Sequence, residues 1–274
     1  MLSFLVLGNW GRRGHRDQSA VAQGLAHAAR DLNAQFVVTT GDNFRPSGIS
    51  GVLDPQFHDS FDAVYTDSAL DLPWYASLGD CDHHGDVSAQ AEYAEHDLRW
   101  RMPDQFYAIN KRVDDRTHAQ FIFLDSTPFS DDRELAAASD PHLQLYWLRN
   151  MLAPSRSDWK IIIGHHDLLT LRTESDGGEA VAPVLHQFGA QVYLNGDSHR
   201  LQLSEQDGIS QVISGAGAGA TPSSNGASTL FQRAEPGFAS VTLDGLTMTI
   251  RFHNAAGEII HEKTLETRSH RQAA

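Results

Sequence analysis

The chain has 274 residues, 41% of them hydrophobic, so it can bury a large core, and we expect one domain spanning residues 1–274. Its 35 acidic residues outnumber its 21 basic ones, and the formal charge of −14 repels a polyanionic backbone, which argues against nucleic acid as a partner. The single cysteine, Cys81, excludes an internal disulfide, and no apolar run approaches the roughly 20 residues of a membrane span. We therefore expect neither disulfides nor membrane insertion.

The apolar start Leu2–Leu7 lacks the basic leader and the cleavage site of a signal peptide and runs into a glycine turn, which favours a strand. If Met1 is the native start, we expect a cytoplasmic protein. If a leader has been removed, we expect a periplasmic or secreted one. The sequence leaves both open.

Strands and helices alternate along the first part of the chain. Leu2–Leu7 and Phe36–Thr40 are apolar runs that end at glycine, and Ser19–Leu32 between them has helical spacing, which predicts a βαβ unit. Four more apolar runs end in polar turns: Trp74–Leu78, Phe121–Leu124, Ile161–Ile163 and Val192–Leu194. Because the carboxyl ends of strands in open α/β sheets converge on one crevice, we expect these turns to share a site.

The last third of the chain is rich in strands. We expect antiparallel strands at Val212–Ser214, Ala239–Leu243, Thr247–Phe252 and Glu258–Thr264, with turns at Asp244–Gly245 and Asn254–Gly257. These strands are predicted to close a sandwich. The glycine-rich segment Gly215–Gly226 has no phosphate-binding pattern before a helix, and we interpret it as a flexible surface loop. A helix is expected at Leu143–Leu152.

The polar turns carry carboxylate, amide and imidazole groups. The candidates are Asn9, Asp42, Asp80, Asp82, His165, His166, Asp197 and His199. Such groups suit divalent first-row metals, which lower the pKa of a coordinated water and polarise a phosphoryl oxygen. Each residue alone is an ordinary turn former, so it is their order that points to chemistry.

Five short blocks follow the predicted strands in order. They are Gly8-Asn9-Trp10-Gly11, Gly41-Asp42-Asn43-Phe44, Gly79-Asp80-Cys81-Asp82, Gly164-His165-His166 and Gly196-Asp197-Ser198-His199. They resemble the blocks of the metallophosphoesterases, particularly the purple acid phosphatases. The resemblance extends to Trp100-Arg101-Met102-Pro103 and Leu124-Asp125-Ser126-Thr127-Pro128 and covers nearly the whole chain.

The resemblance implies an α/β (α+β) fold: a four-layer αββα sandwich of two mixed β-sheets with a two-metal site at one sheet edge. It implies hydrolysis of phosphate monoesters by a metal-activated hydroxide, with histidines that hold the phosphate and protonate the leaving group. Asp42 matches the family's bridging carboxylate, His165 a ligand of the second metal and His199 a ligand of the first.

Two departures weaken the first metal site. Asn9 stands where the family carries an aspartate ligand, and Arg45 stands where the family carries the tyrosinate that gives its purple colour. A guanidinium cannot ligate a metal. We hypothesise that Arg45 lies near Asp42 and Asn9, supplies fixed positive charge in place of the first metal, and faces the phosphate.

The second metal site changes in the opposite direction. Asp80 replaces the family's asparagine ligand and Asp197 replaces the first histidine of the fifth block. Three carboxylates and one imidazole suit Mn²⁺, Fe²⁺, Zn²⁺ or Mg²⁺, in one or two sites. The predicted metal ligands are Asn9, Asp42, Asp80, His165, Asp197 and His199.

The family's catalytic histidine is replaced by Cys81. A thiol beside carboxylates has a raised pKa and is a poor acid or nucleophile. His83, His84 and His166 are best placed in the sequence to protonate a leaving group or contact phosphate, although all three can equally line a polar rim.

Two functions remain open. The first is a metal-dependent phosphoesterase acting on a small phosphorylated substrate, and the second is an impaired pseudophosphatase that binds a phosphorylated ligand or partner. The ligand-capable residues kept at the second site favour the enzyme. No Gly-x-Ser-x-Gly elbow occurs, which argues against a serine hydrolase.

Overall fold

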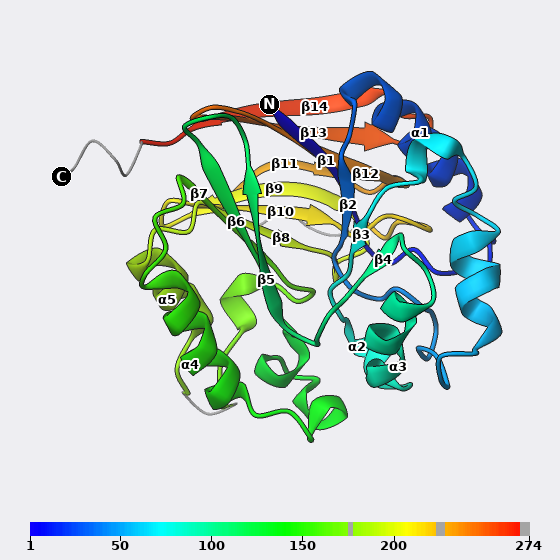
Figure 1. Ribbon diagram of the computed structural model, residues 1–274, viewed down its shortest axis with the longest axis horizontal. Helices are drawn as coiled ribbons and strands as arrows, with labels where there is room; N and C mark the ends of the chain where they lie inside the picture. The colour runs from blue at the N-terminus through cyan, green and yellow to red at the C-terminus, as the bar shows by residue number, and fades with distance from the viewer. Residues whose placement is uncertain (175–177, 223–227, 269–274) are drawn as a thin grey trace.

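The computed structural model describes residues 1–174, 178–222 and 228–268, and these form two mixed sheets of seven strands each (Figure 1). The first sheet has the order β14 (Ile259–Glu266), β13 (Thr247–Asn254), β12 (Gly237–Asp244), β1 (Leu2–Leu7), β2 (Phe36–Thr39), β3 (Trp74–Tyr75) and β4 (Trp100–Arg101). The second has the order β11 (Thr229–Arg233), β9 (Leu201–Gln206), β10 (Ile209–Ser214), β8 (Val192–Asn195), β7 (Trp159–Ile163), β6 (His118–Phe123) and β5 (Tyr107–Arg112).

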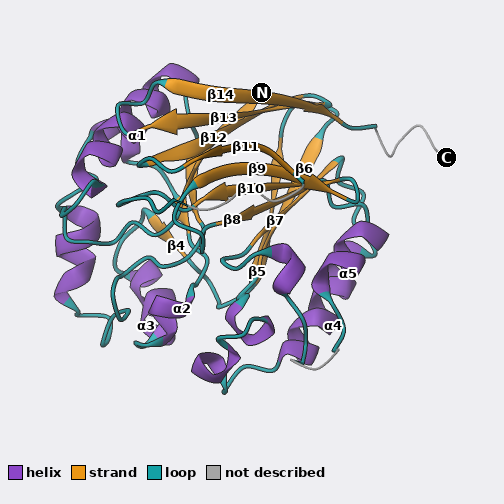
Figure 2. Cartoon of the chain, turned by 180° about the vertical axis from the view of Figure 1, so that it is seen from behind, coloured by secondary structure: helices purple, strands orange, loops and turns teal. Residues whose placement is uncertain are grey.

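Helices cover the outer faces of both sheets (Figures 1 and 2). Helix α1 (Gln18–Leu32) packs against β1, β12 and β13 of the first sheet. Helices α4 (Pro141–Leu152) and α5 (Val181–Gln187) bury apolar side chains in one cluster with residues of the second sheet. A larger cluster joins the inner faces of the two sheets. The predicted four-layer αββα sandwich is therefore confirmed.

The strands in the middle of each sheet are short and apolar, because a central strand is covered on both faces and its side chains are all buried. Every residue of β1, β2, β7 and β8 is buried. β1 pairs in parallel with β2 and antiparallel with β12, which makes the first sheet mixed. The predicted turn at Asp244–Gly245 is present between the antiparallel strands β12 and β13, with Gly245 at φ 56°.

The interpretation of Gly215–Gly226 as a flexible surface loop is wrong for its first part. Gly215 to Ala218 are buried. The Gly217 N–H donates to the Gly8 carbonyl at 3.0 Å, and a Cβ on Gly215 would lie 1.8 Å from the Gly196 carbonyl oxygen. The glycines permit close approach of three loops at the carboxyl edges of the sheets. Residues 223–227 of the segment lie outside the described residues.

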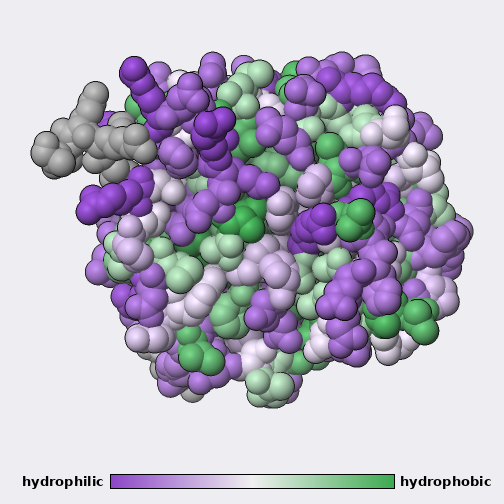
Figure 3. All heavy atoms as spheres, in the orientation of Figure 1, coloured by the Kyte–Doolittle hydropathy of each residue, from purple (hydrophilic) through white to green (hydrophobic). Residues whose placement is uncertain are grey.

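The face of the molecule seen in Figure 3 is largely hydrophilic, with apolar side chains scattered over it. Within the described ranges, every helix is too short or too polar to cross a lipid bilayer.

Candidate metal centre

The predicted site residues follow the carboxyl ends of the strands. Asn9 follows β1, Asp42 follows β2, Asp80 opens the short helix α2 (Asp80–His83) after β3, and His165 follows β7. Asn9 and Asp42 both have left-handed backbones, with φ of 56° and 55°, a conformation that Asn and Asp adopt more readily than most residues. These turns direct the side chains toward one another.

Asp42, Asp80 and His165 form a cluster. Their ligand atoms all lie within 4.8 Å of one another. His165 Nε2 lies 3.1 Å from Asp80 Oδ1 and 3.6 Å from Asp42 Oδ1. Asp42 and His165 are fully buried, whereas the Asp80 side chain is 29% exposed, so the cluster meets solvent at Asp80.

His165 is held in the orientation typical of a metal ligand. Its Nδ1 lies 2.7 Å from the Thr40 carbonyl, which can only accept, so Nδ1 carries the proton and Nε2 faces the two carboxylates. Burial lowers the pKa of His165, but the hydrogen bond to Asp80 and the nearby carboxylate charges outweigh this and leave the pKa raised. The surroundings of Nε2 therefore favour positive charge. Two carboxylates and one imidazole fit a divalent cation at this point.

The opposite side of Asp42 is occupied by Arg45. Its Nη1 donates to Asn9 Oδ1 at 2.9 Å and forms an ion pair with Asp42 Oδ2, and its side chain is only 14% exposed. Asn9 Nδ2 donates to the carbonyls of Gly196 at 2.7 Å and Gly215 at 3.0 Å, which turns Oδ1 toward the guanidinium. Arg45 thus lies where the sequence hypothesis put it. On this side, Asp42 Oδ2 and Asn9 Oδ1 both already accept from a guanidinium.

Asp197 and His199 have different electrostatic surroundings. Asp197 is exposed, and its charge helps to raise the pKa of His165. His199 is half-buried, and burial and the positive charge of Arg45 lower its pKa. That these two residues ligate a metal stays a prediction.

The two residues after Asp80, Cys81 and Asp82, form hydrogen bonds with the loop that carries Asp42. The Cys81 N–H donates to Asp42 Oδ1 at 2.9 Å, and burial raises the pKa of the Cys81 thiol to about 11. Asp82 is a wrong candidate ligand, because both its oxygens accept hydrogen bonds from loop backbone, including Asn43 N at 3.1 Å and Phe44 N at 3.2 Å. It fastens the loop that carries Asp42.

The three candidate catalytic histidines have different environments. His83 Nε2 lies 3.0 Å from both oxygens of Asp125, and the two side chains are 4% and 1% exposed. His84 is exposed and lines a surface depression with Asp54 and Asp86. His166 is buried against Ser126, with Nδ1 2.9 Å from the serine Oγ. Of the three, His166 and His83 pack closely against the turns that hold the cluster.

Sequence reasoning missed the residues that orient the histidines. The Ser126 Oγ accepts the N–H groups of His165 and His166, and the Tyr193 hydroxyl donates to the His166 carbonyl. Ser126 lies in the turn after β6, where the Leu124-Asp125-Ser126 block already marked a strand end. The position of Ser126 at a predicted strand end was the sequence signal that could have pointed to it.

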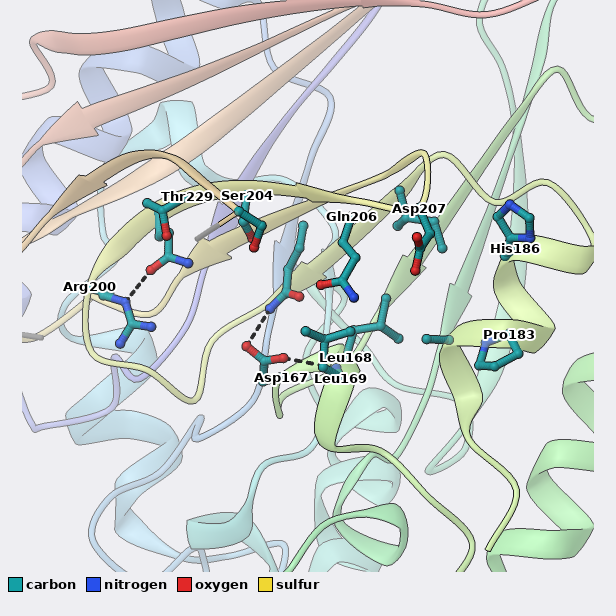
Figure 4. A pocket seen from close by; sticks show the side chains of 15 residues that line it. Asp167, Leu168, Leu169, Pro183, His186, Arg200, Ser204, Gln206, Asp207 and Thr229 are labelled. Atoms are coloured by element: carbon teal, nitrogen blue, oxygen red, sulfur yellow. Dashed lines mark hydrogen bonds between the residues drawn. The ribbon is translucent and has the colours of Figure 1, made fainter. Parts of the chain in front are cut away.

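A cavity of about 630 Å³ lies on the outer face of β9 and β10 beside η6 (Leu168–Thr170) and α5. Arg200 lies at one end and His186 at the other (Figure 4). Gln211 Nε2 donates to Asp167 Oδ2 at 3.1 Å in its wall and to Asn195 Oδ1 at 3.2 Å. The cavity is separate from the Asp42, Asp80 and His165 cluster, none of which lines it.

Comparison with known proteins agrees with this geometry. The family model of the calcineurin-like phosphoesterases matches residues 2–201. Purple acid phosphatase 17 of Arabidopsis thaliana is 32% identical, over 95% of this chain and 83% of the plant protein. The chain belongs to the calcineurin-like phosphoesterases, in the purple acid phosphatase group. This confirms the resemblance seen in the five sequence blocks.

Other relatives of this phosphoesterase cover similar lengths. Human tartrate-resistant acid phosphatase type 5 is 28% identical, over 98% of this chain and 92% of the human protein. Among solved structures, GAP50, the anchor in the inner membrane complex of Plasmodium, superposes with a TM-score of 0.84 at 21% identity, covering 97% of this chain and 89% of that one. Purple acid phosphatase PPD1 from yellow lupin superposes with a TM-score of 0.68 at 13% identity, covering 98% and 54%. At these identities the structural matches show the fold alone.

Proposed function

We propose that this phosphoesterase hydrolyses phosphate esters with a single divalent cation and that Arg45 takes the place of a second one. One observation carries the proposal: Asp42 is shared between two different partners. Its Oδ2 pairs with Arg45, and its Oδ1 lies in the cluster with His165 and Asp80.

Asp42, Asp80 and His165 would hold the cation. Asp197, an exposed residue whose charge helps to raise the pKa of His165, would complete a set of three carboxylates and one imidazole. A cation bound there would polarise a phosphoryl oxygen and lower the pKa of a coordinated water. The carboxylate-rich set suits Mn²⁺, Fe²⁺, Zn²⁺ or Mg²⁺.

Arg45 would bind the phosphate of a small phosphorylated substrate. Its Nη1 is committed to Asn9 and Asp42, whereas its buried Nε has no hydrogen-bond partner among the described residues. A guanidinium fixed by two acceptors loses little further freedom on binding an oxyanion, and its remaining donors match phosphate oxygens. His83, paired with Asp125, would support the Asp80 turn rather than transfer a proton.

A second candidate function is binding without turnover. The Arg45 ion pair favours it, because it takes up one oxygen of the carboxylate that the family uses to bridge two metals. Cys81 also supplies no acid, since its thiol has a pKa of about 11. In this case the crevice would bind a phosphorylated ligand or partner.

The deciding experiment measures metal content by elemental analysis on protein purified without a metal-chelating tag. Turnover of p-nitrophenyl phosphate is assayed on the same sample before and after addition of Mn²⁺, Zn²⁺, Fe²⁺ or Mg²⁺. One metal per chain with metal-dependent turnover supports the proposal. Two metals per chain contradict the role of Arg45, and neither tight metal nor turnover at any addition favours the binding protein.

A further inference from the structure

Ser126 makes three polar contacts through one hydroxyl oxygen. The N–H groups of His165 and His166 point to its Oγ at 2.9 Å and 3.1 Å, and His166 Nδ1 lies 2.9 Å from the same atom. A serine hydroxyl has one hydrogen and two acceptor lone pairs. Backbone N–H groups can only donate, so they occupy both lone pairs. The hydroxyl hydrogen must therefore donate to His166 Nδ1.

This arrangement determines the tautomer of neutral His166. With Nδ1 accepting from Ser126, the ring proton is on Nε2. The residue cannot easily turn away, because the buried Tyr193 hydroxyl donates to its carbonyl at 2.9 Å and the ring lies edge-on to His165, with centroids 5.0 Å apart. His166 thus presents an N–H donor at Nε2, on a ring that contacts His165 of the cluster.

That donor has no hydrogen-bond partner within the described part of the chain. Nε2 is buried, and His166 as a whole is 4% exposed. The nearest carboxylate oxygen, Asp132 Oδ2, lies 3.5 Å away on a side chain that is 54% exposed. A buried polar group without a partner is uncommon and costs free energy, so its presence points to a ligand that completes it.

We propose that Ser126 is a positioning residue that fixes His166 in the Nε2–H tautomer, and that this N–H donates to a phosphate oxygen of the bound ligand. Both lone pairs of the serine oxygen are occupied, so it cannot accept a hydrogen bond from an Nδ1–H group. His166 therefore keeps its proton on Nε2, and a ligand at Nε2 must be a hydrogen-bond acceptor. The ligand in this inference rests on the proposed function, whereas the tautomer rests on the hydrogen-bond geometry alone.

The tautomer is measured by long-range ¹H–¹⁵N correlation NMR on the full chain with ¹⁵N-labelled histidines and diamagnetic Zn²⁺. Comparison with His166→Gln identifies the His166 signals. We expect Nε2–H in the unmodified chain and in Ser126→Thr, which keeps the hydroxyl. In Ser126→Ala we expect a mixture of the two tautomers. An Nδ1–H tautomer in the unmodified chain, or the same Nε2–H tautomer in Ser126→Ala, would overturn the positioning role.

The ligand contact is measured by adding inorganic phosphate to the same samples. We expect the His166 Nε2 resonance to shift, and phosphate affinity to fall roughly tenfold in Ser126→Ala and in His166→Gln, as expected for loss of one well-placed hydrogen bond. Ser130→Ala is the matched control, because Ser130 lies in the same turn but bonds only local backbone, with its Oγ donating to the Thr127 carbonyl. Asp132→Asn should also leave the affinity unchanged. An unshifted resonance at saturating phosphate would overturn the contact.

The two proposals fail in different ways. A chain that lacks turnover but shows the phosphate-induced shift keeps this inference and loses the proposed hydrolysis. A chain with metal-dependent turnover, in which Ser126→Ala changes neither tautomer nor phosphate affinity, keeps the hydrolysis and loses this inference.

Discussion

The two carboxylate oxygens of Asp42 have different neighbours that can compensate its negative charge. On one side a buried guanidinium, Arg45, pairs with Oδ2 and is tied to Asn9. On the other, Oδ1 lies in a cluster with His165 and the partly exposed Asp80, and none of these three residues is a lysine or an arginine. The Arg45 guanidinium is part of the chain and is always present. A metal ion in the cluster that contains Asp80 would have to bind from solvent and could leave again. Under the proposed function, one carboxylate would therefore separate a fixed positive charge from an exchangeable metal ion.

The largest expected effect comes from breaking the cluster that contains Asp80. His165→Asn should reduce tightly bound metal to near zero and lower metal-dependent turnover more than about 100-fold, beyond what loss of an outer partner of a metal ligand costs. Elemental analysis and p-nitrophenyl phosphate assays on the same sample measure both quantities. His199→Asn is the comparison, because His199 is not part of the Asp42, Asp80 and His165 cluster and the charge of Arg45 lowers its pKa, and it should leave metal content unchanged. Equal metal loss in both variants would contradict the division.

The next effect comes from the fixed cation. Arg45→Met should lower kcat/KM by about 10- to 100-fold, the range expected for loss of a hydrogen bond to a charged group, while metal content stays the same. Arg13→Met, which removes an exposed arginine from the neighbouring turn, should have little effect. If Arg45→Met bound a second metal, the guanidinium would be shown to be the group that excludes it.

Cys81 provides a smaller test of the surroundings of Asp42. With burial raising its pKa to about 11, the thiol should be alkylated by iodoacetamide at pH 8 about 100-fold more slowly in the folded chain than in the chain unfolded in urea. As the only cysteine, it reports without interference. Cys81→Ala should keep turnover within about twofold, since a neutral thiol takes no part in proton transfer. Rapid alkylation of the folded chain would contradict this.

The smallest effect concerns the pair of His83 and Asp125. Burial lowers the pKa of His83, but the hydrogen bond and charge of Asp125 outweigh it and leave the pKa raised above 6.5. A raised folded-state pKa gives stability that is fully present below the unfolded pKa and is lost as the pH rises through the folded one. His83→Gln should therefore lower the free energy of unfolding more at about pH 5.5 than at about pH 8.5. Urea denaturation at both values measures it, and a larger loss at the higher pH would contradict the sign.

Much of the fold follows from the sequence because its central strands are short apolar runs ended by glycine. β1 and β12 to β14 lie close to their predicted positions. β5 and β11 were not predicted, since they are partly exposed strands at the ends of the second sheet and carry weak apolar patterns. Helix α5, only seven residues long, gave little periodic signal.

The site was predictable in position but not in the details of side-chain direction. The blocks correctly brought Asp42, Asp80 and His165 together. Asp82, two residues from Asp80, faces the opposite way into the loop backbone, and spacing alone does not separate the two. The glycines near Gly215 suggested flexibility although they serve close packing, because the same residue type permits both. Ser126 has no chemical signature until its three contacts are seen together.

The hydrogen bonds of the Asn9 side chain limit which substitutions its position accepts. Its amide nitrogen donates to two carbonyls, those of Gly196 and Gly215. An aspartate there, as in the family pattern, would direct a carboxylate oxygen at both carbonyls and keep Arg45 as a neighbour. An Asn9→Asp substitution alone should therefore be destabilising. In the proposed one-cation centre, Asn9 and Arg45 would have to change together before a second metal could bind.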